Sequence, residues 1–213
     1  MTNKVAIITG GGSGIGRGIA VAFAREGAKV VIAGRHSEKL DTVAKDIGPA
    51  CLPQPADVSK REDIQNLVAK TLEKFGGIHI LVNNAGLLLP GGAESLTEEE
   101  WDQTFNVNVR GLWLLSRAVL PHLRSAGGGS IINIGSVLSL VAARNRVAYS
   151  ASKGAVLAMT RAMALDYAAE KIRVNCISPG IVETEMVARF SMDENARRQR
   201  LAMHPMGRFG QPE

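Results

Sequence analysis

The sequence predicts an α/β fold in which a doubly wound parallel sheet carries helices on both faces. Short apolar, β-branched segments alternate with segments of helical periodicity along the 213 residues. A glycine-rich turn follows the first apolar segment and opens the first helical one. Right-handed crossovers between such segments give the strand order 3-2-1-4-5-6. Since no repeat or low-complexity tract interrupts the pattern, we expect a single domain over residues 1–213.

The first half of the chain is expected to hold three strand–helix units. Strands are predicted at 4–8, at 29–33 and just before Asp57, and helices at 15–27, 37–48 and 59–75. Gly27 and Gly48 are typical of positions where a helix ends. Ser59-Lys60-Arg61-Glu62 has the spacing of a capping box and predicts the start of the third helix.

The second half continues the alternation. Strands are predicted at 79–82, 130–134 and 173–177. A second capping box, Thr97-Glu98-Glu99-Glu100, starts a long helix that is expected to reach about Leu120, and another helix carries Tyr149 and continues through Tyr167. A substrate-loop insertion near 181–205 is expected after the sixth strand.

Composition excludes several classes of protein. Apolar residues make up 46% and charged residues 21%, as is ordinary for a globular domain. Cys51 and Cys176 lie in predicted strands and are interpreted as reduced core residues, and the four scattered histidines show no ligand spacing, so no metal is predicted. No leader or membrane-spanning run is visible, and we expect a cytoplasmic protein without membrane contact.

The net charge is +5, and basic residues gather near the end of the chain: Arg189, Arg197, Arg198, Arg200 and Arg208. A nucleic-acid patch is one interpretation, but no DNA-binding motif accompanies the charge, so no nucleic-acid partner is predicted. Phosphates of a cofactor or an anionic substrate would use part of this charge, and solvated helix faces the rest.

The glycine-rich turn is Thr9-Gly10-Gly11-Gly12-Ser13-Gly14-Ile15-Gly16. Glycine lets the backbone turn tightly and approach a ligand closely. The N–H groups at the start of the following helix then face outward with the positive end of the helix dipole behind them, which suits a pyrophosphate. The alternative is a tight turn that binds nothing.

Tyr149 and Lys153 lie four residues apart, on one face of the predicted helix. A free tyrosine has a pKa near ~10 and is a poor proton donor or acceptor at neutral pH. A neighbouring cation favours the phenolate and is expected to lower that pKa toward the working range. By itself the pair is weak evidence, since this spacing occurs by chance on many solvated helices.

Together these features resemble the short-chain dehydrogenase/reductase family, over essentially all 213 residues, in its 3-oxoacyl-(acyl-carrier-protein) reductase-like branch. The motifs that carry the resemblance are the glycine turn, Asn83-Asn84-Ala85-Gly86, Asn108, Ser136 placed thirteen residues before Tyr149, and Pro179-Gly180 with Thr184. The resemblance implies a Rossmann-type fold. It also implies an NAD(P)-dependent oxidoreductase that moves a hydride between nicotinamide and a carbonyl or secondary alcohol.

The resemblance assigns roles to four residues. Tyr149 would be the general acid or base, Lys153 would lower its pKa and bond the nicotinamide ribose, Ser136 would hold the substrate oxygen, and Asn108 would anchor a water. Ser139 is a rival for Ser136. The expected cofactor-binding residues are Gly10, Gly12, Ser13, Gly14, Ile15, Gly16, Arg35, Asp57, Val58, Asn84, Ala85, Gly86, Tyr149, Lys153, Pro179, Gly180 and Thr184.

The end of the second strand bears on the choice of cofactor. NAD-specific relatives carry an acidic residue where this chain has Gly34, and Arg35 follows, where it can pair with a 2′-phosphate. NADP is therefore favoured over NAD. Ser13 weakens this preference, because many NADP-preferring relatives are basic there. Asp57-Val58 resembles the family's adenine contact, although Asp57 can also cap the next helix.

Other functions stay open at this stage. A non-catalytic dinucleotide-binding sensor or scaffold would keep the fold without turnover, and a methyltransferase also uses a glycine turn but has no need of the Tyr–Lys pair. The family implies a dimer or tetramer formed through the helices after Thr97 and Tyr149. Family members usually continue with another helix and a seventh strand. The sequence stops at Gln211-Pro212-Glu213, apparently without these elements, so we expect the sixth strand to be a sheet edge.

The substrate is expected to be a small carbonyl or alcohol held by three segments, 87–93, 137–146 and 181–204. The first is apolar and the second contains Arg144 and Arg146. Such a pocket suits a ketone bearing a carboxylate or a thioester-linked acyl chain, and sugars and polyols are equally compatible.

Overall fold

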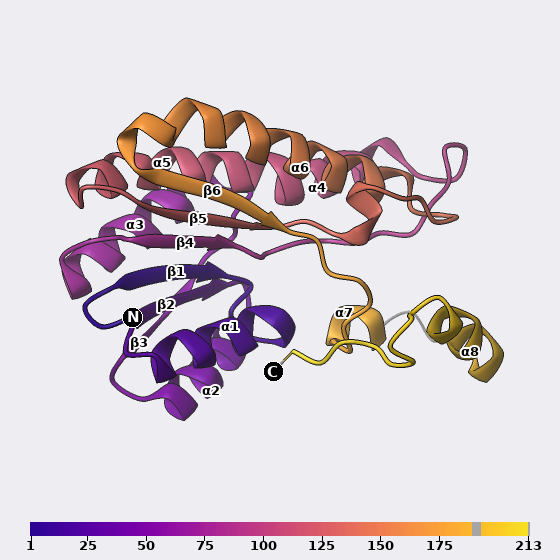
Figure 1. Ribbon diagram of the computed structural model, residues 1–213, viewed down its shortest axis with the longest axis horizontal. Coiled ribbons are helices and arrows are strands. Elements are labelled where there is room, and N and C mark those ends of the chain that lie inside the picture. The colour runs from indigo at the N-terminus through magenta and orange to yellow at the C-terminus, as the bar shows by residue number, and fades with distance from the viewer. Residues whose placement is uncertain (189–192, 213) are drawn as a thin grey trace.

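The computed structural model describes residues 1–188 and 193–212. Its centre is a six-stranded parallel sheet of order β3-β2-β1-β4-β5-β6 (Figure 1), which confirms the predicted topology. The strands are β1 (Val5–Thr9), β2 (Lys29–Gly34), β3 (Cys51–Pro55), β4 (Ile80–Asn83), β5 (Gly129–Ile134) and β6 (Ile172–Ile177).

Helices connect the strands and cover both faces of the sheet. They are α1 (Gly14–Arg25), α2 (Ser37–Ile47), α3 (Arg61–Phe75), α4 (Glu98–Phe105), α5 (Leu112–Ser125), α6 (Val147–Tyr167), α7 (Glu185–Ala188) and α8 (Glu194–Ala202). Shorter segments are a π-helix η1 (Asn106–Gly111) and the 3-10 turns η2 (Val137–Ser139) and η3 (Ala168–Glu170).

Two apolar cores explain why the helices divide between the faces. Strand side chains alternate in direction, so Ala6 and Ile8 pack with α1 and α2 on one face, while Ile7 packs with α3, α5 and α6 on the other. All three β1 residues are fully buried. Burial on both faces is why the strands are nearly continuous apolar runs rather than alternating ones.

Two local expectations were wrong. Ser59 does not cap α3: its hydroxyl donates to Asp57 Oδ1 at 2.7 Å, and Lys60 is the residue before the helix. The long helix predicted after Thr97 is interrupted, because six residues between α4 and α5 form the π-helix η1. The capping box at Thr97 is confirmed, with reciprocal bonds between Thr97 and Glu100.

The carboxyl ends of the strands form one edge of the molecule, and the segment after β6 lies beside it. Figure 1 shows α7 and α8 at this edge, past the end of β6. Strand β6 is the last strand in the described sheet, as expected, and Ile177 at its end is 52% exposed. Within the described residues, no helix is long and apolar enough to cross a membrane.

Candidate active site

The glycine turn forms a shallow cradle between β1 and α1. Gly10 and Gly14 have φ angles of +65° and +52°, in the left-handed region that favours glycine. A Cβ at Gly16 would lie 2.3 Å from the Gly10 carbonyl oxygen, so only glycine lets α1 begin so close to the turn. No side chain caps α1, which leaves its first N–H groups facing outward. This cradle fits a pyrophosphate.

Thr9 ties the glycine turn to the loop after β4. Its hydroxyl accepts the N–H groups of Asn84 and Ala85, at 3.0 and 2.9 Å. In return the Asn84 side chain donates to the Thr9 carbonyl at 2.8 Å. These reciprocal bonds hold the loop that contains Gly86 beside the glycine turn, since β1 and β4 both end at the same edge of the sheet.

Tyr149 and Ser136 meet at the same edge. Tyr149 lies in the first turn of α6, and its side chain is close enough to Ser136, which follows β5, for the Ser136 hydroxyl to lower the Tyr149 pKa. Ser139, the rival candidate, is used differently, because its hydroxyl accepts the Ser136 N–H at 3.2 Å and closes the η2 turn. Of the two serines, Ser136 is therefore the one that acts on the Tyr149 pKa.

Lys153 lies beneath the Tyr149 ring. Its ammonium is 5.7 Å from the ring centroid and donates to the Ile134 carbonyl at 2.7 Å. The residue is only 4% exposed. A Cβ built on Gly86 would lie 3.6 Å from Lys153 Nζ, an ordinary contact distance, so the ammonium lies beside Gly86.

Asn108 lies in η1 and joins three segments. Its amide donates to the Leu87 carbonyl and to the Ser152 hydroxyl, both at 2.9 Å, and its Oδ1 accepts the Leu87 N–H at 2.7 Å. Ser152 in turn donates to the Tyr149 carbonyl. Both N–H donors of the amide are thus used, and Oδ1 keeps one lone pair that faces the space near Gly86.

The electrostatics of Tyr149 differ from the sequence-based expectation. Burial raises the pKa of Tyr149, and the nearby Ser136 hydroxyl and the Arg146 charge oppose this rise to a smaller extent. The expected net lowering of this pKa was wrong for the protein without a bound dinucleotide: Lys153 is not among the groups that lower it, and burial lowers the pKa of Lys153 itself to about 8. The four-residue spacing in the sequence predicted that Tyr149 and Lys153 lie close together, but it could not predict how deeply the two side chains are buried.

The expected adenine side of the cradle lies at the ends of β2 and β3. Asp57 accepts both the N–H and the hydroxyl of Ser59, and these bonds, with the nearby Arg35 charge, outweigh burial and lower the pKa of Asp57. Arg35 is exposed. Val58 packs against Gly111 of η1, where a Cβ would lie 2.7 Å from the Val58 carbonyl oxygen.

The segment after β6 closes over the glycine turn. The Pro179 carbonyl accepts the Val137 N–H at 2.8 Å, which fixes it beside Ser136. Gly180 contacts His204, and Thr184 lies against Gly14. Sequence reasoning missed Lys39, which packs against Gly12 and forms an ion pair with Glu185 across the turn. Its place in the first turn of the helix after the second strand was the sequence feature that could have indicated that Lys39 lies near the glycine turn.

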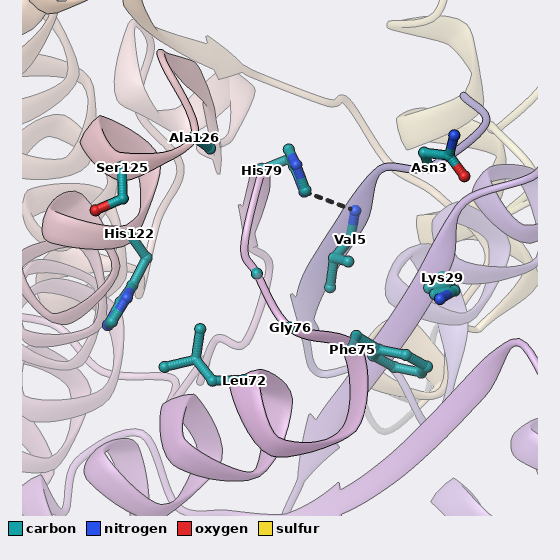
Figure 2. Close-up of a pocket in the computed structure, with 11 residues that line it drawn as sticks. Asn3, Val5, Lys29, Leu72, Phe75, Gly76, His79, His122, Ser125 and Ala126 are labelled. Atoms are coloured by element: carbon teal, nitrogen blue, oxygen red, sulfur yellow. Dashed lines mark hydrogen bonds between the residues drawn. The ribbon is translucent and has the colours of Figure 1, made fainter.

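A separate pocket of about 370 Å³ lies at the opposite edge of the sheet. Figure 2 shows His79 there, with its Nδ1 accepting the Val5 N–H at 3.1 Å. The ends of α3 and α5 also line this pocket. Helix carboxyl ends carry partial negative charge, so this edge does not suit a pyrophosphate.

Metal ligation and thiol chemistry have little support in the described chain. No group of three or more His, Cys, Asp or Glu side chains there is placed to hold a metal ion. Cys51 and Cys176 are free thiols, and both are only partly buried rather than core residues. Burial raises the pKa of the Cys51 thiol to about 11, which keeps it protonated and unreactive.

Comparison with known proteins identifies the family. The sequence model of short chain dehydrogenases matches residues 4–195. This chain belongs to the short-chain dehydrogenase family. The match spans every part of the site from the glycine turn to Thr184, and it confirms the sequence-based assignment to an oxidoreductase family.

The relatives share most of the chain's length. A 3-oxoacyl-(acyl-carrier-protein) reductase of Thermotoga maritima is 37% identical, with 100% of this chain and 87% of the relative covered. The 2-(R)-hydroxypropyl-CoM dehydrogenase of Xanthobacter autotrophicus is 41% identical, with coverage of 98% and 86%. Reductases and dehydrogenases thus both occur among the relatives.

A solved structure supports the same assignment. The 3-ketoacyl-(acyl-carrier-protein) reductase of Brucella melitensis, complexed with NADH, has a TM-score of 0.93 at 40% identity. The alignment covers 99% of this chain and 86% of that one. The chain is therefore a Rossmann-type oxidoreductase of the branch that resembles 3-oxoacyl reductases, and its family binds nicotinamide dinucleotides.

Proposed function

We propose that this protein reduces a small carbonyl compound, or oxidises the matching secondary alcohol, with Tyr149 as the general acid or base. In the reducing direction the carbonyl carbon gains a hydride and its oxygen gains a proton, while the reduced dinucleotide becomes the oxidised one. When bound, the nicotinamide supplies or accepts the hydride. The observation that carries the proposal is the placement of the Tyr149 side chain beside Ser136, with the ammonium of the buried Lys153 5.7 Å from the Tyr149 ring centroid.

The surrounding residues divide the remaining roles. Ser136 binds the substrate oxygen and aligns it with the Tyr149 hydroxyl. Lys153 is held by the Ile134 carbonyl, with its ammonium beside Gly86, where it can bond a ribose hydroxyl. Asn108 keeps one acceptor lone pair for a water next to Lys153, which opens a path for proton exchange with solvent.

The preferred cofactor is NADP. No acidic residue stands at the end of β2, and Arg35 is exposed where a 2′-phosphate would need a cation. The glycine turn at 10–16, Asp57-Val58, Asn84 to Gly86 and Pro179 to Thr184 would hold the rest of the dinucleotide. The Brucella relative was solved with NADH, so both cofactors belong in every assay.

The segment at 181–205 is proposed as the loop that covers the substrate. Arg189, one of the basic residues near the end of the chain, lies outside the described residues. The assembly is proposed to be a homodimer or homotetramer, and the enzyme to work in the cytoplasm. The partner is a small molecule rather than a nucleic acid or a membrane.

Replacing Tyr149 by phenylalanine tests the proposed chemistry. Tyr149→Phe keeps the ring over Lys153 but removes the proton donor, so kcat should fall by roughly 10²- to 10⁴-fold while NADPH still binds. Steady-state turnover with a carbonyl and alcohol panel gives kcat, and cofactor fluorescence gives the dissociation constant.

The matched control is Tyr167→Phe, because Tyr167 is the other tyrosine of the chain and lies in the same helix, far from Ser136. It should leave kcat unchanged. Equal turnover in Tyr149→Phe and the wild type would remove Tyr149 from the mechanism. Tight cofactor binding with no activity on the whole panel would favour the non-catalytic sensor or scaffold.

A further inference from the structure

Lys39 lies where the glycine turn meets the end of β2. It is the third residue of α2, and a Cβ built on Gly12 would lie 3.1 Å from the Lys39 Cβ. The neighbouring Leu40 is buried, and its Cδ2 would lie 3.4 Å from a Cβ on Gly12 and 3.7 Å from a Cβ on Gly34. The first turn of α2 is therefore packed between the glycine turn and the place where Arg35 follows β2.

Glu185 reaches Lys39 from the segment that follows β6. It is the first residue of α7, and the preceding Thr184 lies against the glycine turn, with its Cγ2 3.0 Å from a Cβ built on Gly14. The Thr184 carbonyl also accepts the Ala188 N–H at 2.9 Å, which holds α7 at this place. The Glu185 carboxylate thus spans the turn and pairs with the Lys39 ammonium.

This ion pair lies at the surface, on the side of the cradle where the 2′-phosphate of NADP is expected. The Lys39 and Glu185 side chains are 38% and 53% exposed. Ion pairs with this exposure contribute little to stability, because water and salt screen them. Separating Lys39 from Glu185 therefore costs little free energy.

A phosphate monoester is a stronger partner for an ammonium than a carboxylate is. It carries more negative charge and offers three acceptor oxygens, so a lysine beside it forms charge-assisted hydrogen bonds. The flexible stem of a lysine lets the ammonium turn from one anion to another without a change in the backbone. Lys39 is thus suited to serve two anions in turn.

We infer that Lys39 exchanges its partner when the cofactor binds: the ammonium leaves the Glu185 carboxylate and pairs with the 2′-phosphate of NADP. The inference rests on the proposed function, because it takes NADP as the cofactor and expects its 2′-phosphate at the end of β2. Lys39 becomes a second residue that selects the cofactor, and Glu185 competes with the phosphate. NADH has no 2′-phosphate and leaves the ion pair intact.

The two halves of the ion pair should change NADPH binding in opposite directions. Lys39→Gln removes a cation from the phosphate, so Kd for NADPH should rise by roughly 3- to 30-fold. Glu185→Gln removes the competing carboxylate, so Kd for NADPH should fall by roughly 2- to 5-fold. Kd for NADH should stay within a factor of about two in both variants. Titrations followed by cofactor fluorescence give all of these constants.

Lys45→Gln and Glu73→Gln are the matched controls. Lys45 is an exposed lysine in the last turn of α2, and Glu73 is the acidic half of another surface ion pair, with Lys70 at 2.8 Å. Both controls should leave Kd for NADPH unchanged. Lys39→Arg keeps the charge and should bind NADPH nearly as well as the wild type. Circular dichroism checks folding, and Glu185→Gln carries the test if Lys39→Gln does not fold.

Adenosine 2′,5′-bisphosphate supplies a readout that does not depend on catalysis. It carries the 2′-phosphate without the nicotinamide, and adenosine 5′-monophosphate is the matched probe without the 2′-phosphate. In isothermal titration calorimetry, Lys39→Gln should weaken binding of the bisphosphate by the same factor as NADPH and leave the monophosphate unchanged. High ionic strength should shrink the difference, because salt screens exposed charges.

A structural tie between α2 and α7 is the rival explanation. If the ion pair only holds α7 over the cofactor, Lys39→Gln and Glu185→Gln should both weaken NADPH and NADH alike, and that result would overturn the inference. A bisphosphate that binds no better than the monophosphate would overturn it too, because the protein would then have no site for a 2′-phosphate.

Two outcomes separate the inference from the proposed function. If the two variants shift NADPH binding in opposite directions but no carbonyl on the panel turns over, the exchange of partners stands and the proposed reductase function fails. If carbonyls turn over with NADPH and neither variant changes its Kd, the function stands and the inference is wrong.

Discussion

Lys153 is the residue whose surroundings differ most from those of a free side chain. It is buried next to the Ile134 carbonyl, and burial lowers its pKa from 10.5 to about 8. Near neutral pH it still carries a charge, and holding that charge in the interior costs stability. The site thus holds a cation where a bound dinucleotide can use it, and the protein without dinucleotide is less stable as a result.

This burial predicts how stability depends on pH. The pKa of Lys153 in the folded protein lies below that in the unfolded chain, so the unfolded chain binds more protons between pH 8 and 10.5. Stability from this group is therefore lowest below pH 8 and rises with pH. Between about pH 7.5 and 9.5 the free energy of unfolding should gain on the order of 2 kcal/mol.

Urea unfolding at the two pH values measures this gain. Lys153→Met removes the titrating group, so the gain should be absent from the variant. Cys51, whose thiol pKa is raised by burial, titrates in both proteins and cancels from the comparison. Identical pH slopes in the two proteins would show that Lys153 is not held in a perturbed state.

Arg35 is predicted to select the cofactor. Arg35→Ala removes the cation beside the expected 2′-phosphate, so KM for NADPH should rise by roughly 10- to 100-fold while KM for NADH changes little. His36→Ala is the control, because His36 is the exposed neighbour and lies 3.6 Å from Glu38. Equal losses for both cofactors in Arg35→Ala would end the argument for NADP.

Individual site residues were predictable from the sequence where the backbone conformation allows only one type of residue. Glycine at positions 10, 14 and 16 follows from positive φ angles or from close backbone approach. The direction of the Tyr149 pKa was not predictable, because it depends on burial by segments distant in sequence.

At the scale of elements, the π-helix η1 places Asn108. A π-helix makes a local bulge, which is common at functional sites. Here it brings the Asn108 side chain against Leu87 and Ser152. Sequence periodicity could not reveal it, because a short shift in backbone pairing leaves the apolar spacing on either side almost unchanged. The six strands and helices α1, α2, α3 and α6 were predictable because their apolar runs are long and bounded by turn residues. Helices α7 and α8 were not predicted, because they lie in the segment near 181–205, for which only a loop was expected.

Gly111, at the end of η1, is predicted to be intolerant of a side chain. A Cβ there would lie 2.7 Å from the Val58 carbonyl oxygen, and the backbone on both sides is fixed. Gly111→Ala should therefore lower the free energy of unfolding by roughly 1–3 kcal/mol. It should also weaken cofactor binding, since Val58 is expected to contact the adenine.

Gly154→Ala is the matched control for this prediction. Gly154 lies inside α6, and a Cβ there would meet nothing within 4 Å. Because alanine favours a helix more than glycine does, this variant should gain roughly 0.5–1 kcal/mol. Urea unfolding measures both variants, and a Gly111→Ala protein as stable as the wild type would show that η1 can move away from Val58.

At the scale of the whole molecule, large apolar side chains are exposed on the helices proposed to join subunits. Trp101 on α4, Trp113 on α5 and Leu165 on α6 are 38%, 44% and 82% exposed. Exposed apolar groups on neighbouring helices are typical of an interaction surface. The sequence indicated the helices through the family resemblance, and the structure adds which side chains lie on their outer faces.

Assembly through this surface is the last prediction. The wild type should run as a dimer or tetramer in light scattering, and Leu165→Lys should shift it toward the monomer, because a charge buried without a partner opposes association. Met206→Lys changes an equally exposed methionine, 75% exposed, near the end of the chain and should leave the assembly intact. The protein has two tryptophans, one on α4 and one on α5, so their fluorescence should shift to longer wavelength when the subunits separate. A wild type that is monomeric at micromolar concentration, with fluorescence independent of dilution, would show that these side chains face solvent in the working enzyme.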